Sequence, residues 1–334
     1  MSLWFGKKKS EKEKIITLLD VENASVGVAL VRLPTEAQAV LGQAPQLLVQ
    51  KRIALPVAHT LDAARLVHET EKAVHEVLVY ARASATEEVS PVAAFLGAPW
   101  SAPSWARPIQ NQVVDPLWEF EPYVHKSIMH LVQGAPISFY AFGSAAMHAA
   151  DTAFEHDQAF ILCVVTGEVC EILCIQNNTI VARATLPFGV HTLSRTLSSH
   201  AGVSLSAARS ALHLVDTSSA HKHAGPSWIH EPLSVAATHF ATHFTEAARE
   251  LHIDALSGEP AHSVLVVAPE PLGELFASIL GNNAERLSKL FPNGGVVRAL
   301  RAHHLVPHFS SAGVAVPDLR LMTEALFINK HTRT

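Results

Sequence analysis

The feature that most constrains this chain is an order of segments that occurs twice. In each half, two apolar segments joined by a short polar turn are followed by a third apolar segment and then by apolar residues at helical spacing. The predicted strands are 15–20, 25–33 and 47–55 in the first half and 160–165, 170–176 and 179–186 in the second. The repeat distance of about 145 residues is too long for a solenoid and fits two lobes of a duplicated domain. The pattern therefore predicts an α/β structure with mixed sheets.

The repeat suggests a division of the chain into two lobes with short additions at the ends. A strand is also predicted at 92–100, before a loop rich in proline, serine and tryptophan. The expected parts are a flexible leader at 1–14, a first lobe at 15–140 with a small inserted subdomain as an option, a second lobe at 141–327 and a tail at 328–334.

Local signals mark several boundaries of the predicted elements. Thr60 is a candidate N-cap for the long helix that follows the third strand, and Ser204 is one for a helix in the second half. Gly202 fits a helix C-terminus that needs a left-handed residue. The dipeptide Asn177–Asn178 favours a tight hairpin turn, because asparagine tolerates positive φ.

Composition indicates a chain with a large core. Of its 334 residues, 49% are hydrophobic and 16% are charged, and the formal net charge of -5 argues against a basic nucleic-acid-binding face. The longest apolar runs are well short of the roughly 20 residues that span a bilayer. For the opening MSLWFGKKK we prefer a solvated tail over a weak contact of Trp4, Phe5 and Lys7 to Lys9 with an anionic membrane surface.

The three cysteines, Cys163, Cys170 and Cys174, all fall within one predicted strand pair. Their odd number and the lack of a Cys-x-x-Cys motif argue against a disulfide framework or a zinc knuckle. We expect buried thiols that behave as small apolar side chains.

The 21 histidines raise the question of a metal site. The best local candidate is His239 with His243, four residues apart on a predicted helix, and Glu246 further along the same face. The His-Glu-x-x-His motif of zinc proteases is absent. Solvated helix histidines are the interpretation that we prefer, and we expect no metal site.

Three stretches, taken in order, resemble the actin-like ATPases, and within them the FtsA and PilM families. The start FGKKKSEKEKIITLLDVENASVGVALVRL is similar to PilM starts, where a short leader precedes a first strand that ends in aspartate. The stretch ILCVVTGEVCEILCIQNNTIVARATLPFGVHTLSRTL resembles the second phosphate segment of both families, and SVLVVAPEPLGELFASIL lies where they carry the adenosine turn. The resemblance implies a duplicated, ribonuclease H-like, two-lobed fold with mixed sheets and a central cleft.

In the first turn, the resemblance implies that Asp20 is the carboxylate of a phosphate and Mg²⁺ turn, with Asn23 and Ser25 as polar contacts. Glu22 stands in place of a family glycine, and its charge would repel phosphates in a cleft of reduced dielectric. The alternative is that Asp20 only accepts backbone N–H bonds within its own hairpin.

In the second turn, the resemblance aligns Val164 with the family's strand-end aspartate and Thr166 with a glycine. Gly167 is retained, Glu168 occupies a position that PilM proteins also fill with an acid, and Glu171 falls at the last acidic position. Because valine cannot order the water shell of Mg²⁺, a second metal-side carboxylate is missing on this alignment. We expect Asp20 and Gly167 to face each other across one cleft.

In the adenosine turn, the family's Gly-Gly pair corresponds to Ala268–Pro269. Ala268 adds a Cβ where a base or ribose passes, and Pro269 removes a backbone donor. The six residues that would form this degenerate nucleotide cleft are Asp20, Asn23, Ser25, Gly167, Glu168 and Ala268.

Three functions remain open at this stage. The first is a scaffold of the PilM type, with no catalytic residues and no required cofactor, that binds a short cytoplasmic segment of an inner-membrane pilus-assembly or division protein. Such a protein would lie in the cytoplasm at the periphery of the inner membrane. The second is an active ATP-binding and hydrolysing protein of the FtsA or PilM kind, and weak ATP/Mg binding would be compatible with either. The third is a structural polymer formed by self-association.

Overall fold

A computed structural model of the chain describes residues 13–58, 60, 62–85, 90–103, 118–132, 134–154, 159–215, 227–255, 263–283, 291, 295–310 and 316–332. The predicted leader, including Trp4, Phe5 and Lys7 to Lys9, lies outside these ranges except for residues 13 and 14. Within the described part of the chain, no helix is both long and apolar enough to cross a bilayer.

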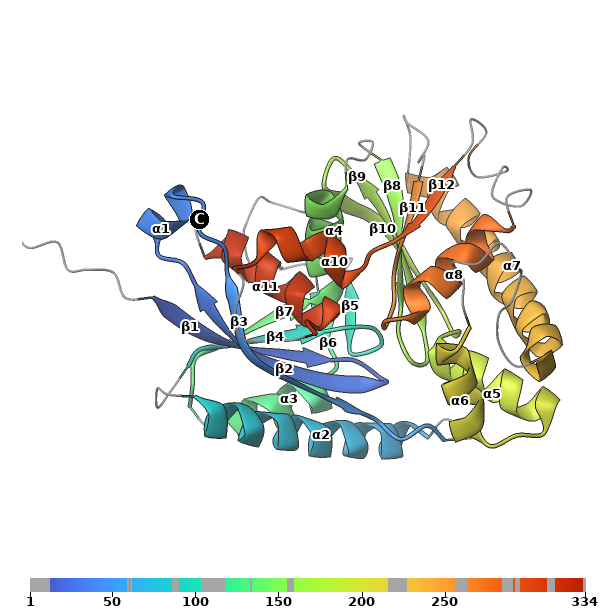
Figure 1. Ribbon diagram of the computed structural model, residues 1–334, viewed down its shortest axis with the longest axis horizontal. Helices are drawn as coiled ribbons and strands as arrows, with labels where there is room; N and C mark the ends of the chain where they lie inside the picture. Colours follow the sequence, from blue (N-terminus) through green and yellow to red (C-terminus); the bar gives the residue numbers. More distant parts are fainter. Residues whose placement is uncertain are drawn as a thin grey trace, which may run out of the picture.

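The first sheet has five strands in the order β3-β2-β1-β4-β7 (Figure 1). Its strands are β1 (Lys14–Val21), β2 (Ser25–Leu33), β3 (Gln46–Ala54), β4 (Val92–Leu96) and β7 (Ile137–Ala141), and its helices are α1 (Glu36–Val40), α2 (Ala63–Ser84) and α3 (Pro122–Val132). Strands β1 to β3 form an antiparallel meander, while β4 pairs in parallel with β1, and β7 with β4. Helix α2 packs on β1 to β3, and α3 packs against α2 on the same side.

The second sheet repeats this arrangement, with the order β10-β9-β8-β11-β12. Its strands are β8 (Ala159–Val165), β9 (Cys170–Gln176), β10 (Thr179–Leu186), β11 (Ser263–Val267) and β12 (Val296–Ala299), and its helices are α5 (Val190–Ala201), α6 (Leu205–His213), α7 (His230–Ala255) and α8 (Leu272–Gly281). Three antiparallel strands are again followed by two parallel ones. Both predicted strand triplets are therefore present, and the prediction of an α/β fold with two mixed sheets is confirmed.

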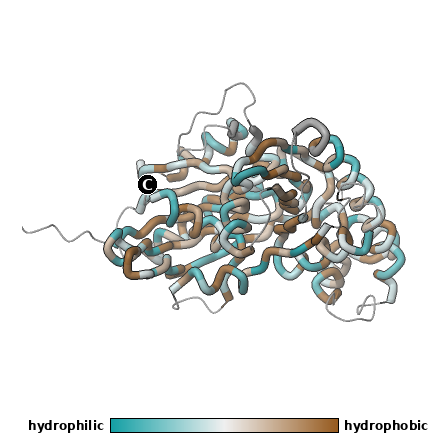
Figure 2. The backbone as a smooth tube through the Cα atoms, turned by 90° about the horizontal axis from the view of Figure 1, so that it is seen from above, coloured by the Kyte–Doolittle hydropathy of each residue, from teal (hydrophilic) through white to brown (hydrophobic). Residues whose placement is uncertain are grey.

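A central layer of helices lies between the two sheets (Figure 1). It consists of α4 (Phe142–Ala153), α10 (Ala302–Leu305) and α11 (Leu319–His331), and α11 packs on α4, β1 and β2. One apolar cluster joins residues of this layer to residues of both sheets. Viewed from above, the most apolar stretches of the backbone lie inside and more polar helices surround them (Figure 2).

Strand alternation determines which side chains of β1 reach the central layer. Ile16 and Leu18 belong to the apolar cluster of α4 and α11, whereas Leu19 and Val21 belong to the cluster of α2 and α3 on the other face. Asp20 has the same parity as Ile16 and Leu18. The strand therefore carries this carboxylate into the interior between the sheets.

Several local predictions are confirmed. Gly202 ends α5 with φ of 64°, and the Ser204 hydroxyl accepts a hydrogen bond from the Ala207 N–H at 3.2 Å at the start of α6. Asn177 and Asn178 have φ of 50° and 57° in the β9–β10 turn. All three cysteines are buried and free.

Two local predictions are wrong. Asp62, and not Thr60, caps α2, because its Oδ1 accepts the N–H groups of Ala64 and Arg65 at 3.0 and 3.3 Å. The strand predicted at 92–100 ends at Leu96, where the chain turns through 98–100. Where one lobe ends and the other begins remains a prediction; α11 continues to His331, beyond the predicted lobe end at 327.

The cap of α2 gives a direct test of this local structure. We expect Asp62→Ala to destabilise the protein by about 1 kcal/mol, because two helix N–H groups lose their partner. The control Thr60→Ala should leave the urea midpoint unchanged. Equal shifts for the two variants would contradict the assignment of the cap.

Candidate functional site

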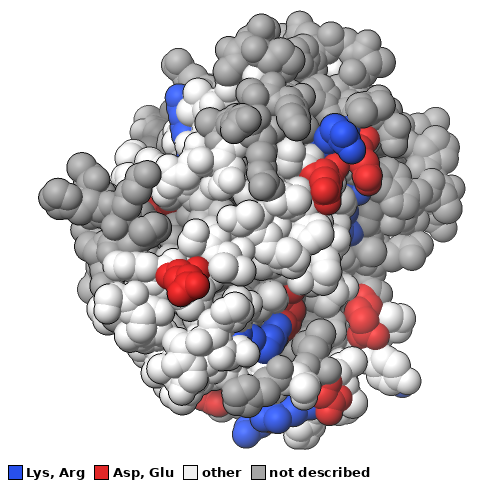
Figure 3. Space-filling view, turned by 90° about the vertical axis from the view of Figure 1, so that its right-hand side faces the viewer, with Lys and Arg blue, Asp and Glu red and all other residues white. Residues whose placement is uncertain are grey.

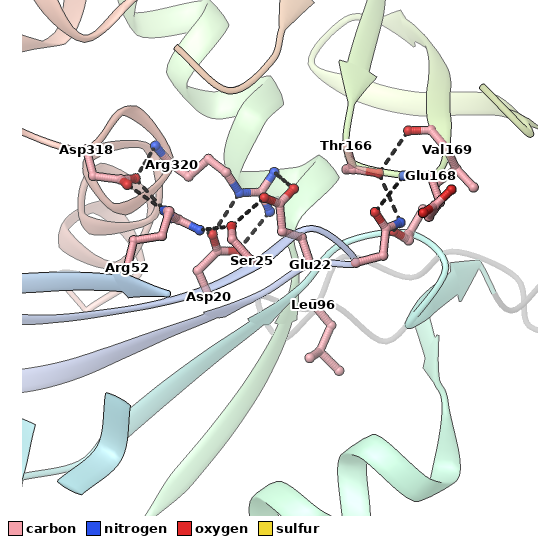
Figure 4. Close-up of polar contacts among 12 residues, drawn as sticks. Asp20, Glu22, Ser25, Arg52, Leu96, Thr166, Glu168, Val169, Asp318 and Arg320 are labelled. Atoms are coloured by element: carbon pink, nitrogen blue, oxygen red, sulfur yellow. Dashed lines mark hydrogen bonds and ion pairs between the residues drawn. The ribbon is translucent and has the colours of Figure 1, made fainter. Parts of the chain in front are cut away.

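The β1–β2 turn and the β8–β9 turn meet at the junction of the two lobes (Figure 4). The Asn23 amide Nδ2 donates to Thr166 Oγ1 at 3.1 Å and to the Ala98 carbonyl at 2.9 Å. In return, the Glu168 backbone N–H donates to Asn23 Oδ1 at 2.8 Å. Asn23 is completely buried, so its side chain holds the two turns together with two hydrogen bonds that water does not weaken, and a third bond ties it to Ala98.

Two glycines allow this close approach. A Cβ on Gly167 would lie 2.5 Å from the Ala24 Cβ and 2.8 Å from Asn23 Oδ1. A Cβ on Gly189, which precedes α5, would lie 2.4 Å from the Gly167 carbonyl oxygen. The first N–H groups of α5, from Val190 and His191, donate to the carbonyls of the 166–167 turn at 3.0 and 2.7 Å. The two turns and the start of α5 therefore form one packed unit.

Asp20 lies in a row of residues that crosses three strands. It is paired with Gly27 on β2, and Gly27 is paired with Arg52 on β3. A Cβ on Gly27 would come within 2.7 Å of the Arg52 guanidinium. The glycine therefore leaves the space in which Arg52 reaches across β2 to donate to Asp20 Oδ2 at 2.8 Å.

Arg320, from the first turn of α11, binds the same carboxylate. Its Nε and Nη2 donate to the two oxygens of Asp20 at 2.7 and 2.8 Å, which is a bidentate pair. The guanidinium carbon lies 3.5 Å from the centre of the Phe142 ring, so the cation also stacks on an aromatic face. Only 5% of the Arg320 side chain is exposed, and the Asp20 side chain is fully buried.

Asp318 completes this buried cluster of charges. It accepts from Arg52 Nε and Nη2 at 2.5 and 3.0 Å and also caps α11 through the N–H groups of Arg320 and Leu321. Because Arg52 thus contacts both Asp20 and Asp318, the beginning of the chain is joined to its last helix. We call Asp20, Arg52, Asp318 and Arg320 the buried ion cluster.

The charge states within this region follow from burial and from the two arginines. Burial would raise the pKa of the Asp20 carboxyl, but the charges of Arg320 and Arg52 outweigh it and hold that pKa well below its usual range. Glu324, one turn after Arg320 and also fully buried, has its pKa raised well above its usual range by burial and by the charge of Asp20. Glu324 therefore favours its neutral form next to an ionised Asp20.

Glu22 and Ser25 extend the cluster towards the turn. The Ser25 hydroxyl donates to Glu22 Oε1 at 2.6 Å and accepts from Arg52 Nη1 at 2.8 Å. Glu22 Oε2 lies 3.7 Å from Arg320 Nη1. Glu22 is 2% exposed. The carboxylate that the resemblance aligns with a family glycine therefore binds side chains of the protein itself and does not face solvent.

Glu168 faces the start of α5. Arg195 Nη1 donates to Glu168 Oε1 at 3.1 Å, and Arg195 Nη2 donates to Oε2. His191 Nδ1 lies 3.0 Å from Glu168 Oε1. Burial raises the pKa of this carboxyl, whereas the hydrogen bonds of His191 and Arg195 and the charge of Arg195 lower it, with a net fall to about 2. The Arg195 guanidinium also donates to the Ala58 carbonyl, which belongs to the first lobe.

The position aligned with the second metal-side aspartate is apolar. Val164 is 1% exposed and belongs to the central apolar cluster. Glu171, its partner across β9, forms an ion pair with Arg183 on β10 at 2.7 Å, and burial raises the pKa of its carboxyl.

A cavity of about 350 Å³ opens beside the buried ion cluster, between the two lobes. It is lined by Arg52 and Arg320 of the cluster, by Arg209 and His213 of α6, and by Ala268 at the β11–α8 turn. Ala268 thus lines this cavity, and its assignment to an adenosine turn remains a prediction of the resemblance. On the face shown in Figure 3, the described Lys and Arg side chains are scattered singly, with acidic side chains beside several of them.

All six residues predicted for the nucleotide cleft lie at the junction or line this cavity. Their role in binding a nucleotide remains a prediction. Asp20, Asn23 and Gly167 are at the junction itself, and the two turns face each other as expected. The two arginines were not predicted from the sequence. Gly27 opposite Asp20 and Arg52 was the available signal for Arg52, whereas Arg320 is 300 positions from Asp20 and gave no local signal.

A phosphate chain with its Mg²⁺ does not fit this arrangement. Both oxygens of Asp20 are bound by guanidinium groups, whose positive charges repel a divalent cation. The space between the turns is filled by Ala24, Asn23 and Gly167. The metal position predicted from the first turn is thus replaced by two arginines of the chain itself.

Comparison with known proteins supports the fold. No protein-family model matches the chain, and no curated protein does. Among solved structures, the ethanolamine utilization protein EutJ from Carboxydothermus hydrogenoformans is similar over 95% of this chain and 90% of its own, with a TM-score of 0.55 and 14% identity. The PilM-PilN type IV pilus biogenesis complex is similar over 94% and 97%, with 0.53 and 12%. The MamK double helical filament is similar over 95% and 99%, with 0.55 and 13%. The chain has the two-lobed fold of the actin-like ATPases, as the resemblance implied.

The buried ion cluster should dominate the stability of the junction. Arg320→Met leaves Asp20 with one of its two cationic partners, and we expect a loss of about 3–5 kcal/mol in the free energy of unfolding. The control Arg32→Met removes an exposed pair with Glu13 at 3.3 Å and should cost less than about 1 kcal/mol. Urea unfolding measures both. Similar losses for the two variants would contradict a central role of the cluster.

The raised pKa of Glu324 predicts that the stability of the protein depends on pH. A carboxyl whose pKa is raised on folding binds its proton more tightly in the folded state, so its contribution to stability falls as pH rises above about 4.5. Glu324→Gln is neutral at every pH and should gain stability relative to the wild type as pH rises from 5 to 8. Thermal melts of both proteins across this range measure the difference, and parallel curves would refute the assignment.

Proposed function

We propose that this chain is a non-catalytic scaffold with an actin-like fold, of the PilM type, that binds a short cytoplasmic segment of an inner-membrane protein. The observation that carries the proposal is the double guanidinium binding of Asp20. An ATPase of this fold needs a carboxylate free to organise a metal and its water, whereas here that carboxylate holds the protein together.

The junction supports a fixed arrangement of the lobes. Hydrolysis cycles in nucleotide-dependent switches use contacts that form and release with the γ-phosphate. In this chain the corresponding turns are bonded directly through Asn23, and the last helix is joined to β1 and β3 through Arg320 and Arg52. A protein held in one state is suited to presenting a constant surface to a partner.

The role as a partner-binding protein rests on similarity alone. A similar structure is a PilM-PilN complex, and another is a MamK filament, so relatives of this fold bind partner proteins and self-associate. On this basis we propose a location in the cytoplasm at the inner membrane and a role in pilus assembly or cell division, with self-association as an additional property. The opening residues Trp4, Phe5 and Lys7 to Lys9 would add a weak contact with anionic lipid.

A second candidate function is nucleotide binding without turnover. The cavity of about 350 Å³ is within the usual size of a small-molecule site, and it receives Arg209, His213 and Ala268 from the second lobe. This cavity lies beside the closed turns, so a ligand there would not require Mg²⁺ at Asp20.

Nucleotide measurements on the full chain distinguish these functions. We expect no ATP hydrolysis and a dissociation constant for Mg·ATP weaker than roughly 1 μM, or less than about 8 kcal/mol of binding free energy. Calorimetry with and without Mg²⁺, together with a phosphate-release assay, measures this. A tight Mg²⁺-dependent complex, or turnover that disappears in a folded Asp20→Asn variant, would show an active enzyme.

The membrane contact is tested by flotation with anionic liposomes. The proposed contact, as opposed to a solvated tail, requires that the full chain float to a greater extent than a variant that lacks residues 1–14, because Trp4 and Phe5 would insert while the lysines attract the lipid headgroups. The double variant Trp4→Ser/Phe5→Ser is the matched control and should behave like the truncation. Equal flotation of all three proteins would remove the membrane contact from the proposal.

A further inference from the structure

Two histidines on the outer helix of the second lobe converge through the same ring atom. His239 and His243 lie one turn apart on α7, and their Nε2 atoms are 2.8 Å from each other. The ring centres are 4.3 Å apart and the ring planes are nearly perpendicular, at 87°. At this distance the two nitrogens share a proton in a hydrogen bond between the rings, and both carry a lone pair for a cation once that proton is displaced.

Glu246 lies beside the other ring nitrogen of His243. Its Oε2 lies 3.5 Å from His243 Nδ1, on the side of the ring opposite His239. In histidine, the hydrogen bond made by one ring nitrogen decides which of the two nitrogens is available to a metal ion, and a carboxylate is a common partner in that bond. This is the outer-shell arrangement commonly found behind metal-binding histidines.

Contrary to the expectation of solvated helix histidines from the sequence, we infer that His239 and His243 form a surface site for a divalent transition-metal ion, with Glu246 as a positioning residue. The distance between the nitrogens decides the class of ion. Two nitrogens 2.8 Å apart, each about 2.0–2.1 Å from a metal, subtend an angle of about 90° at the ion. This angle suits the tetragonal or octahedral geometry of Cu²⁺ and Ni²⁺, whereas a tetrahedral zinc site would need a wider separation of about 3.3 Å.

The protein supplies two ligands, and water fills the other positions. Within the described ranges, no group of three or more histidine, cysteine or carboxylate side chains is arranged to hold a metal ion. The His243 and Glu246 side chains are 49% and 58% exposed, so an ion reaches the site directly from solvent. Helix α7 packs on β9 and β10 of the second sheet (Figure 1). The two histidines are therefore not part of the lobe junction.

Core packing holds the turn of α7 that carries the two histidines. The neighbouring Phe240 and Phe244 are fully buried against the second sheet, so the opposite face of this turn of α7 is fixed by core packing. The centre of the Phe188 ring lies 6.2 Å from the centre of the His239 ring, so Phe188 is the aromatic neighbour of His239 on one side. Holding both histidines on a packed helix reduces the entropy lost when an ion binds.

Calorimetric titration of the untagged full chain with NiCl₂ and CuCl₂ tests the site. We expect a one-to-one step, tighter for Cu²⁺ than for Ni²⁺. His239→Gln and His243→Gln should each weaken it by about tenfold or more, since loss of an outer-shell partner alone costs that much. The control His200→Gln changes another exposed histidine, on α5, and should titrate like the wild type.

The outcome for Glu246→Gln separates positioning from ligation. This variant should keep the one-to-one step at reduced affinity, and electron paramagnetic resonance of the Cu²⁺ complex should still report two imidazole nitrogens. Because all four positions are exposed, the variants should melt like the wild type, which thermal melts verify. Absence of the step in the wild type, or identical titrations for His239→Gln, His243→Gln and His200→Gln, would overturn the inference.

Discussion

A single buried carboxylate organises this protein. Asp20 lies in the interior between two sheets, where an unpaired negative charge would cost several kcal/mol. Two guanidinium groups offset that cost, one from β3, which lies beyond β2 in the sheet, and one from the last helix, 300 positions away. Since removing either partner leaves a charge buried without full compensation, the first strands and α11 depend on each other.

The same interaction determines what the cleft can do. In the actin-like fold the end of the first strand is a natural place for a carboxylate that faces phosphate and metal. Here Arg320 and Arg52 bring fixed positive charges to that place, and Asn23 bonds the two turns across the junction. Two cations of the chain itself thus occupy the end of the first strand, and the two turns are bonded directly to each other.

Because these contacts join the two lobes directly, the structure is suited to a role that does not need an opening and closing cycle. The neighbouring ion pairs follow the same logic, since Glu168 joins Arg195 and His191 while Arg195 also reaches the first lobe at Ala58. Each contact links segments that are distant in sequence. The scaffold that we propose would derive its constant shape from these links, and the cavity beside them leaves room for a small molecule without altering the junction.

The sequence by itself determined the duplicated order of elements, because strand triplets with short turns and a following helix are local patterns. The Asn177–Asn178 turn and the Gly202 helix end were found for the same reason, since backbone conformation at those positions depends on the residue itself. The resemblance to actin-like proteins added the pairing of the Asp20 and Gly167 turns. Errors occurred where two nearby candidates competed, as for Thr60 and Asp62, or where an apolar run continued into a turn after Leu96.

Only the tertiary structure decided what surrounds Asp20. Arg320 lies in α11, and no local pattern connects it with a strand at the other end of the chain. Strand register placed Gly27 between Asp20 and Arg52, and a shift of one residue would have turned these side chains to the opposite face. The physical reason is that partners of a buried charge are selected by proximity in the folded chain, which sequence spacing does not encode.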